Sequence, residues 1–332
     1  MMLDESLWRR SGHMDYFKEN MFFSSVEKHD YAIKPMSCPG AMLNYNEKRR
    51  SYKDLPLRIC ELGHVHRNEN SGSLHGLLRV RSFVQDDAHI FCSKQDVKQE
   101  IKSVLSLFEK ILGKCGLNDY KVELSLRGDK KKYLGSDEGW QEAENYLFEA
   151  VSEFGWEVER KLGEAKFYGP SLDLHIKDRK DRYWQCSSLQ FDFNLPEKFE
   201  ISYLNREAKK EIPYVLHRAV FGSLERFIGL LLEYYQGALP VWMAPVQLKI
   251  LVLDSSVEVE AKKLANDLWD HGVRIEMDLR DEHINEKILK AQREKVPWML
   301  MYGKNEASSG LYSLRSLQGE DSLRHPSLDE FV

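Results

Sequence analysis

The most regular pattern of polar and apolar positions in the chain runs from Arg79 to Ile90. Its even-numbered positions are mostly apolar, as at Val80, Val84 and Ala88. Successive side chains of a β-strand point to opposite faces, so this alternation predicts a strand with one packed face and one polar face. The odd-numbered positions of the polar face are Arg79, Arg81, Phe83, Gln85, Asp87 and His89.

A second strand pattern precedes this one and begins near Arg58. It carries Arg67 and Glu69 just before a polar loop over residues 70–76, which is rich in glycine and serine. Such a loop between two strand patterns is typical of a β-hairpin. We therefore expect a hairpin that places the charged end of the first strand beside the polar face of the second.

Two amphipathic helices and further strands follow the hairpin. The first helix pattern has Ser93 as its N-cap and ends at Gly113 or Gly116, and the second spans residues 137–154. A strand is predicted at 120–126, and alternating patterns over 157–193 predict several more. Together these elements predict an α+β domain built on a largely antiparallel sheet.

The composition changes at residues 236–247, where glycine and proline become frequent, and we place a domain boundary there. Residues 1–238 form the first predicted domain and residues 239–332 the second. In the second domain, short apolar strands alternate with helices predicted at 257–271 and 283–295. This order predicts a smaller α/β domain with a mixed sheet.

Bulk properties restrict the class of protein. The 332 residues carry a net charge of −5, so no strong basic field indicates a nucleic-acid partner. The five cysteines are odd in number and form no CxxC pair, which favours free thiols in a reducing compartment, by default the cytoplasm. We expect no signal peptide and no membrane anchor, because the longest apolar run, at 228–232, is short.

The polar face of the hairpin suits a planar, anionic ligand that bears an amine. Guanidinium groups bind phosphate, and a phenylalanine ring can stack on a base, so ATP fits the set. The competing interpretation is an antiparallel sheet with one solvated face, where alternating charge is ordinary. The pattern alone leaves both interpretations open.

Three sequence motifs carry a resemblance to a known family. RNENSGSLHGLLRVRSFVQDDAHIF resembles the second signature motif of the class II aminoacyl-tRNA synthetases, and within them it is most similar to the threonyl-tRNA synthetase family. KPMSCPG at 34–40 and HRAVFGSLERFIGLLLE at 217–233 match the same family in the same order. The resemblance implies the α+β catalytic fold of class II synthetases, followed by an anticodon-binding α/β domain.

The resemblance also implies the residues that bind ATP. Arg67 would contact the α-phosphate, and Arg226 the terminal phosphate, so both are catalytic candidates. Phe83 would stack on adenine, Glu69 would accept from the adenine amino group, and Mg²⁺ would bridge phosphate oxygens. The complete set implied for ATP is Arg67, Glu69, Arg79, Phe83, Gln185 and Arg226, and the set implied for the amino acid is Gln85, Asp87, Tyr168 and Gln190.

The same resemblance implies one zinc ion held by Cys38, His89 and His217. Three protein ligands leave a coordination position open for substrate, which is the pattern of a catalytic site. The spacing of these residues matches no compact metal motif, and His64 with His66 on one strand face is the competing cluster. Many family members have a histidine where this chain has Ala41, and that departure bears on the pocket beside Cys38.

Further expectations concern the two ends of the chain. His13 corresponds to a histidine that the family uses in transfer to tRNA, as a general base. The family's first motif, which builds its dimer interface, and its editing region would lie upstream of Met1, so we expect a fragment of a protein that is a homodimer at full length. In the second domain, Lys287, Lys290, Arg293 and Lys295 lie on one predicted helix that could meet phosphate, although an ordinary exposed helix would look the same.

The expected activity is that of a threonine-tRNA ligase with threonine, ATP and tRNA(Thr) as partners. Zinc would select threonine over valine. The alternative is a synthetase-like paralogue that binds tRNA or an amino acid for regulation. A zinc hydrolase built on His64 or His66 lacks a paired base at recognisable spacing.

Overall fold

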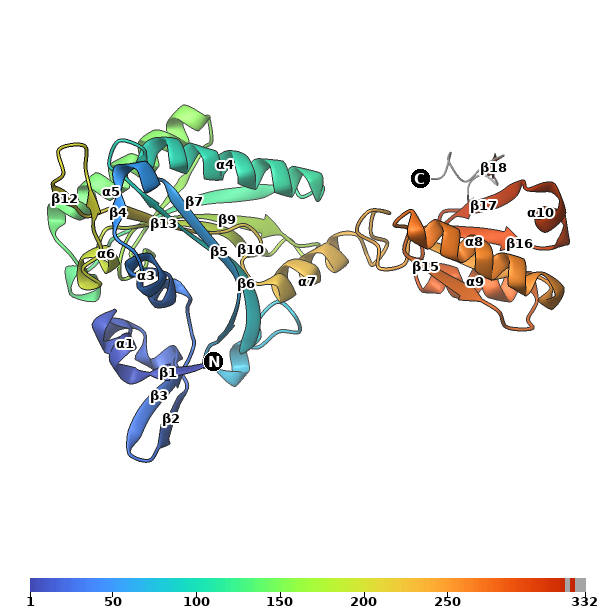
Figure 1. Ribbon diagram of the computed structural model, residues 1–332, viewed down its shortest axis with the longest axis horizontal. Helices are drawn as coiled ribbons and strands as arrows, with labels where there is room; N and C mark the ends of the chain where they lie inside the picture. The colour runs from blue at the N-terminus through green and yellow to red at the C-terminus, as the bar shows by residue number, and fades with distance from the viewer. Residues whose placement is uncertain (320–322, 326–332) are drawn as a thin grey trace. The chain divides into compact units, whose positions relative to one another are not determined.

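The computed structural model describes residues 1–319 and 323–325. The chain divides into two compact units, Met1–Leu230 and Leu231–Val332 (Figure 1). This division falls a few residues before the boundary that we place after residue 238, which remains our proposal. Among the described residues, no helix combines the length and the apolar character that crossing a membrane requires.

A seven-stranded sheet forms the centre of the first unit. Its strand order is β5-β6-β13-β10-β9-β7-β8, and every neighbouring pair is antiparallel except β7 and β8. The prediction of a largely antiparallel sheet is therefore confirmed. The strands are β5 (Leu57–His66), β6 (Ser82–Cys92), β7 (Tyr120–Leu126), β8 (Glu159–Leu162), β9 (Ser171–Lys177), β10 (Tyr183–Asp192) and β13 (Tyr214–Ala219).

Two long helices, α4 (Val97–Lys114) and α5 (Asp137–Phe154), pack on this sheet and against each other (Figure 1). α5 has the predicted bounds because Ser136 caps its first turn and Gly155, with a φ of 86°, ends it in the left-handed conformation. α4 begins one turn later than predicted. Ser93 and Asp96 bond to each other in a preceding turn, so Ser93 is not the N-cap.

Smaller elements surround the sheet. A three-stranded sheet at the N-terminus has the order β1-β3-β2, and a second small sheet has the order β12-β11-β4. Cys38–Asn46 forms α3, with Pro39 and Gly40 inside its first turn, where proline loses no hydrogen bond. The sequence pattern predicts Pro39 and Gly40 as a turn before a helix over 41–49, and the structure shows that this prediction is wrong. The remaining elements are β1 (Met2–Asp4), α1 (Glu5–Arg10), α2 (His13–Tyr16), β2 (Phe23–Val26), β3 (His29–Ile33), β4 (Arg50–Ser51), α6 (Leu195–Lys198), β11 (Tyr203–Leu204), β12 (Lys210–Glu211) and α7 (Leu224–Tyr234).

The second unit contains a mixed five-stranded sheet with the order β15-β14-β16-β17-β18. β14 is parallel to β15 and β16, and the other pairs are antiparallel, which confirms the predicted mixed sheet. The helices predicted at 257–271 and 283–295 are found at these positions, and a further short helix over 304–309 was not predicted. The elements are β14 (Leu248–Val252), α8 (Glu258–Asp270), β15 (Ile275–Asp278), α9 (Ile284–Arg293), β16 (Trp298–Tyr302), α10 (Lys304–Ser309), β17 (Tyr312–Ser316) and β18 (Leu323–His325).

One basic residue of α9 does not face solvent. Lys287 is 1% exposed, and its ammonium donates to the carbonyl oxygens of Val252 and Asp278. These carbonyls end two neighbouring parallel strands, so the buried cation ties the strand ends together. The expectation that Lys287 could meet phosphate is therefore wrong, whereas Lys290, Arg293 and Lys295 are exposed.

Candidate active site

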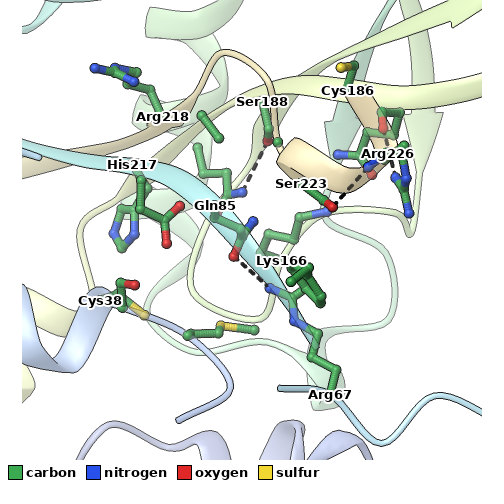
Figure 2. Close-up of a pocket in the computed structure, with 18 of the residues that line it drawn as sticks. Cys38, Arg67, Gln85, Lys166, Cys186, Ser188, His217, Arg218, Ser223 and Arg226 are labelled. Atoms are coloured by element: carbon green, nitrogen blue, oxygen red, sulfur yellow. Dashed lines mark hydrogen bonds between the residues drawn. The ribbon is translucent and has the colours of Figure 1, made fainter. Parts of the chain in front are cut away.

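A cavity lies on the polar face of the hairpin in the first unit (Figure 2). With the exception of His13, every site residue predicted from the sequence lines it. Figure 2 shows Cys38 and His217 at one end of this cavity, and Ser223 and Arg226 at the other. The predicted residues that it brings together are Cys38, Arg67, Glu69, Arg79, Phe83, Gln85, Asp87, His89, Tyr168, Gln185, Gln190, His217 and Arg226.

The guanidinium of Arg67 enters the cavity just beyond the end of β5. It donates to the Gln85 side-chain oxygen at 3.3 Å and to the Pro35 carbonyl at 3.3 Å. The ring of Phe83 lies 5.1 Å from its central carbon, which places a cation beside an aromatic face. Burial lowers the pKa of Arg67, while the nearby Asp87 opposes that shift. The group remains a cation, and no carboxylate of the described residues forms an ion pair with it.

Arg226 is positioned by the start of α7. Its Nε donates to the Leu78 carbonyl at 2.7 Å and its Nη1 to the Gln185 carbonyl at 2.7 Å. The preceding turn needs a glycine, because Gly222 has a φ of 68° and an added Cβ would lie 2.5 Å from the Cys186 carbonyl oxygen. The two backbone carbonyls hold the guanidinium without neutralising its charge.

The loop between β5 and β6 contributes an ion pair. Arg79 donates to one carboxylate oxygen of Glu69 at 2.8 and 3.0 Å. Arg81 donates to the Glu69 backbone carbonyl at 2.9 Å and is not among the residues that line the cavity. The residues of the polar face therefore differ in role. Arg81 holds the loop, whereas Arg79 and Phe83 on either side of it line the cavity.

The three predicted zinc ligands lie at the other end of the cavity. His89 and His217 are paired directly across β6 and β13, with ring centroids 4.6 Å apart, and Cys38 begins α3. All three side chains are buried. Burial raises the pKa of the Cys38 thiol and lowers the pKa of His89, so this imidazole is neutral.

The donor chemistry of these three residues suits zinc, which binds thiolate and neutral imidazole. Nε2 of His217 lies 2.8 Å from the Asp192 carboxylate, which leaves its Nδ1 available to a metal. A carboxylate on the far ring nitrogen is a common feature of histidine ligands. The side chains are not gathered, however: within the described part of the chain, no three His, Cys, Asp or Glu side chains form a group that could hold a metal ion.

The competing histidine pair lies elsewhere. The rings of His64 and His66 are 4.7 Å apart, and both contact the Ser82 hydroxyl. Neither residue lines the cavity. The pair is therefore separate from the arginines and from the buried thiol.

The structure does not bring His13 to the cavity. Its side chain is fully buried, with Nδ1 2.7 Å from the Ser11 hydroxyl and Nε2 3.1 Å from the Met36 sulfur. Its Nε2 lies 3.8 Å from the Cys38 sulfur. Burial, with the positive charges of neighbouring groups, lowers the pKa of His13 to about 3. His13 is therefore neutral and enclosed behind Cys38, and its role in transfer stays a prediction.

Sequence reasoning missed two groups beside the cavity. Lys166 lines it, and Figure 2 shows this side chain pointing into the same space as Arg67 and Gln85. Asp173 is buried beneath it and bonds to the cavity-lining Ser188 at 2.6 Å. A lone cation in the apolar segment AKFYGP was a signal for Lys166, whereas nothing in the sequence marked Asp173.

The antiparallel sheet and the arginine-lined cavity are those of a class II aminoacyl-tRNA synthetase. The family model described as tRNA synthetase class II core domain (G, H, P, S and T) matches residues 21–235, and the model described as anticodon binding domain matches 247–332. Together with the relatives described next, these matches show that the chain belongs to the threonyl-tRNA synthetase family.

Three relatives illustrate the similarity. The threonine–tRNA ligases of Caldanaerobacter subterraneus subsp. tengcongensis and Clostridium botulinum are 48% and 46% identical to this chain over its whole length. The chain covers 51% and 52% of them, about half the length of these curated relatives. A crystal structure described as the RNA binding domain of threonyl-tRNA synthetase from Cryptosporidium parvum Iowa II has a TM-score of 0.95 and 36% identity, over 99% of this chain and 82% of that one.

Proposed function

We propose that this chain carries the catalytic and anticodon-binding parts of a threonine-tRNA ligase. The observation that carries the proposal is the cavity itself, which Arg67 and Arg226 enter from separate elements, with Cys38 and His217 at the end away from Arg226 (Figure 2) and His89 beside His217. Cations at one end suit the phosphates of ATP, and the polar, metal-binding side chains at the other suit a small amino acid. The family relationship supports the same assignment.

The nucleotide half of the cavity would hold ATP by charge and stacking. Arg67 would contact the α-phosphate and Arg226 the terminal phosphate, because each guanidinium is fixed by neutral acceptors and keeps its charge for a ligand. Phe83 would stack on adenine, and Glu69 would accept from the adenine amino group. Arg79 and Gln185 would support this half, and Mg²⁺ would neutralise phosphate oxygens.

The amino-acid half would hold threonine between polar side chains. Asp87 would accept a hydrogen bond from the threonine hydroxyl, because its carboxylate lines this half of the cavity. Burial raises the pKa of this carboxyl, whereas the Ser37 hydroxyl and the charge of Arg67 oppose that shift and favour the ionised form that accepts. Gln85, Tyr168 and Gln190 would complete the contacts. Lys166 would add a cation near the junction of the two halves, where the new acyl-phosphate bond of the adenylate forms.

Cys38, His89 and His217 would hold zinc, which when bound supplies a Lewis acid for the amino and hydroxyl groups of threonine. Asp192 orients His217 for that role. A site that recognises a substrate hydroxyl rejects an analogue that lacks it by about 10⁴-fold or more, whereas one methyl group changes binding by only about 1–3 kcal/mol. Valine should therefore be rejected, and serine should be accepted in part.

The reaction has two balanced steps. A carboxylate oxygen of threonine attacks the α-phosphorus of ATP, and the bond to the β-phosphate oxygen breaks and releases pyrophosphate. A terminal ribose hydroxyl of tRNA(Thr) then loses its proton and attacks the carbonyl carbon, and AMP leaves. The chain contributes position and charge, because Arg67 and Arg226 would fix the phosphates before the first step, and Arg67 would remain on the phosphate of the departing AMP in the second.

Three further parts of the proposal concern the whole protein. The second unit would bind the tRNA anticodon, and at full length the protein would be a homodimer. A cytoplasmic location is supported by the cysteines, since no disulfide joins any of Cys38, Cys60, Cys92, Cys115 and Cys186.

The first test is threonine-dependent exchange of pyrophosphate into ATP, with serine and valine in parallel and the zinc content measured on the same sample. We expect exchange with threonine, less with serine and almost none with valine. No exchange despite bound threonine would favour a regulatory paralogue. Exchange only with an unrelated amino acid would refute the assignment.

A further inference from the structure

The small sheet with the order β12-β11-β4 brings together two basic segments that lie far apart in the sequence. β4 runs parallel to β11, with Arg50 opposite Tyr203, and β11 turns back into β12. Residues 48–53 carry four cations and no carboxylate, and residues 206–210 carry three cations and one carboxylate. Figure 1 shows β4 and β12 at one end of the first unit. We call this region the basic surface, and its cations are Lys48, Arg49, Arg50, Lys53, Arg206, Lys209 and Lys210.

The fold does not neutralise the basic surface. In the part of the chain that the structure describes, no carboxylate forms an ion pair with any of the seven cations, and all of them except Arg50 are exposed. The neighbouring carboxylates bind other donors: Asp54 accepts from the Ser51 backbone at 2.7 Å, and Glu211 from the Tyr203 hydroxyl at 2.5 Å. The Nε of Arg50 is buried and has no acceptor among the described residues. Because like charges gathered in this way repel one another, an anionic partner would relieve the repulsion.

An aromatic ring lies among these cations. Tyr52 is 37% exposed, and its ring centroid lies 5.5 Å from the central guanidinium carbon of Arg206 and 6.0 Å from Nζ of Lys53. Exposed aromatic rings beside cations are typical of RNA-binding surfaces, where the rings contact bases or sugars and the cations contact phosphates. The whole chain has a net charge of −5, so the basic surface is a local feature and not a general excess of cations.

α3 links the basic surface to the cavity. Its first residue, Cys38, lines the cavity, and its last, Asn46, lies two residues before Lys48. The nine residues of this helix span about 13 Å. A nucleic acid whose duplex lies on the basic surface would therefore need only a short single-stranded end to reach the cavity. The acceptor arm of tRNA has this form, because its paired stem continues into an unpaired 3′ end.

We infer that the basic surface binds the phosphate backbone of the tRNA acceptor arm. This inference rests on the proposed function, which supplies the RNA, and it goes beyond that function because it adds an RNA contact in the first unit, away from the anticodon-binding match. Cations that meet phosphates do not read the base sequence. The contact therefore contributes affinity and orientation, and the choice of tRNA is made elsewhere.

The test measures the binding of an acceptor-arm minihelix of tRNA(Thr) by fluorescence anisotropy at several salt concentrations. Arg49→Glu with Lys209→Glu changes one exposed cation in each segment. We expect the Kd to rise at least about 10-fold at low salt, because two phosphate contacts are lost and two repulsions are added. Arg49→Gln with Lys209→Gln removes the contacts without adding charge, and should lower the slope of log Kd against log salt concentration by about two.

The matched control is Lys110→Glu with Lys114→Glu. Both lysines are exposed on α4 in the same unit, and within the described chain neither forms an ion pair. This control should bind the minihelix as the wild-type chain does. Pyrophosphate exchange should be unchanged in all three variants, because ATP and the amino acid do not touch the basic surface.

Three results would overturn the inference: a wild-type chain that does not bind the minihelix, a Kd and salt slope that stay unchanged in the Arg49 and Lys209 variants, or an equal loss in the control. Vesicles of phosphatidylglycerol and phosphatidylcholine test the other partner that this charge would suit, and loss of vesicle binding with intact minihelix binding would also refute the RNA assignment. The ligase proposal is tested separately. Minihelix binding that depends on the basic surface without any pyrophosphate exchange would refute the ligase and not this surface, and exchange with unaltered minihelix binding would refute the surface alone.

Discussion

At the scale of single residues, the two arginines of the cavity are prepared for an anionic ligand in the same way. Arg67 and Arg226 are held mainly by neutral oxygens, from Gln85 and from backbone carbonyls. Each guanidinium thereby keeps its full charge while losing conformational freedom. Preorganised cations of this kind stabilise charge that develops in a transition state without reorganising during the reaction.

Replacement of Arg226 by lysine tests this arrangement. A lysine keeps the charge but cannot donate simultaneously to the carbonyls of Leu78 and Gln185, so its ammonium would not be held at the phosphate position. We expect pyrophosphate exchange to fall about 10²- to 10³-fold, in the range known for the loss of one fixed electrostatic donor. Threonine affinity, measured by calorimetry, should stay within twofold. Arg274→Lys in the second unit is the control, and an equal fall there would contradict the assignment.

The polar face of the hairpin could be predicted from sequence because the alternation of side chains along a strand depends only on residues that are adjacent in the chain. Alternation placed Phe83, Gln85, Asp87 and His89 on one face, and the structure places all four at the cavity. The hydrogen bonds from Ser188 to Asp173 and from Tyr168 to Gln190 could not be predicted in this way. They connect β10 with β9 and with the segment before β9, and no local pattern encodes which side chains of separate segments meet.

At the scale of elements, the residues that cap or end a helix determined how well the bounds of that helix could be predicted. Ser136 and Gly155 mark both ends of α5 unambiguously, and the predicted helix has the observed bounds. Proline and glycine after Cys38 indicate a turn equally well as a first helical turn, and the structure uses them as the latter. Lys287 shows a different limit, because its place on a predicted helix did not reveal the strand-end carbonyls that bury it.

The turn between β9 and β10 depends on one buried carboxylate. Asp178 accepts hydrogen bonds from the backbone of Lys180 at 2.8 Å and of Arg182 at 2.9 Å, from the Arg182 side chain at 2.7 Å and from the Trp184 indole at 2.8 Å. Burial raises the pKa of Asp178, but these donors outweigh burial and lower it from 3.8 to about 2. Its ionised form therefore stabilises the folded hairpin.

This shift predicts how stability depends on pH. A carboxyl whose pKa is lowered on folding contributes its full stabilisation above the unfolded value of 3.8, and loses it as the pH falls toward about 2. We expect Asp178→Asn to lower the free energy of unfolding by about 1–3 kcal/mol at pH 6, and by progressively less between pH 4 and pH 2. Urea denaturation across this range measures the difference. Asp181→Asn, an exposed change in the same turn, should have almost no effect, and a pH-independent difference for Asp178→Asn would refute the explanation.

At the scale of the whole molecule, the proposed function assigns two tasks to two compact units. The complete cavity is built from residues of Met1–Leu230, whereas the anticodon-binding match begins at residue 247. Adenylate formation requires only ATP and the amino acid, and aminoacylation also requires the tRNA. A change in the second unit should therefore affect aminoacylation of tRNA and leave adenylate formation unchanged.

The exposed cations of α9 offer a direct test of this separation. Lys290 and Arg293 are exposed, and they lie about one and about two turns beyond the buried Lys287. We expect Lys290→Glu with Arg293→Glu to reduce tRNA(Thr) charging at least about 10-fold and to lower the salt dependence of tRNA binding by about two, one for each lost phosphate contact. Pyrophosphate exchange should not change. Lys262→Glu with Lys263→Glu on α8 introduces the same charge on another exposed helix of this unit; if that pair reduced charging equally, tRNA would be responding to net charge and not to a contact with α9.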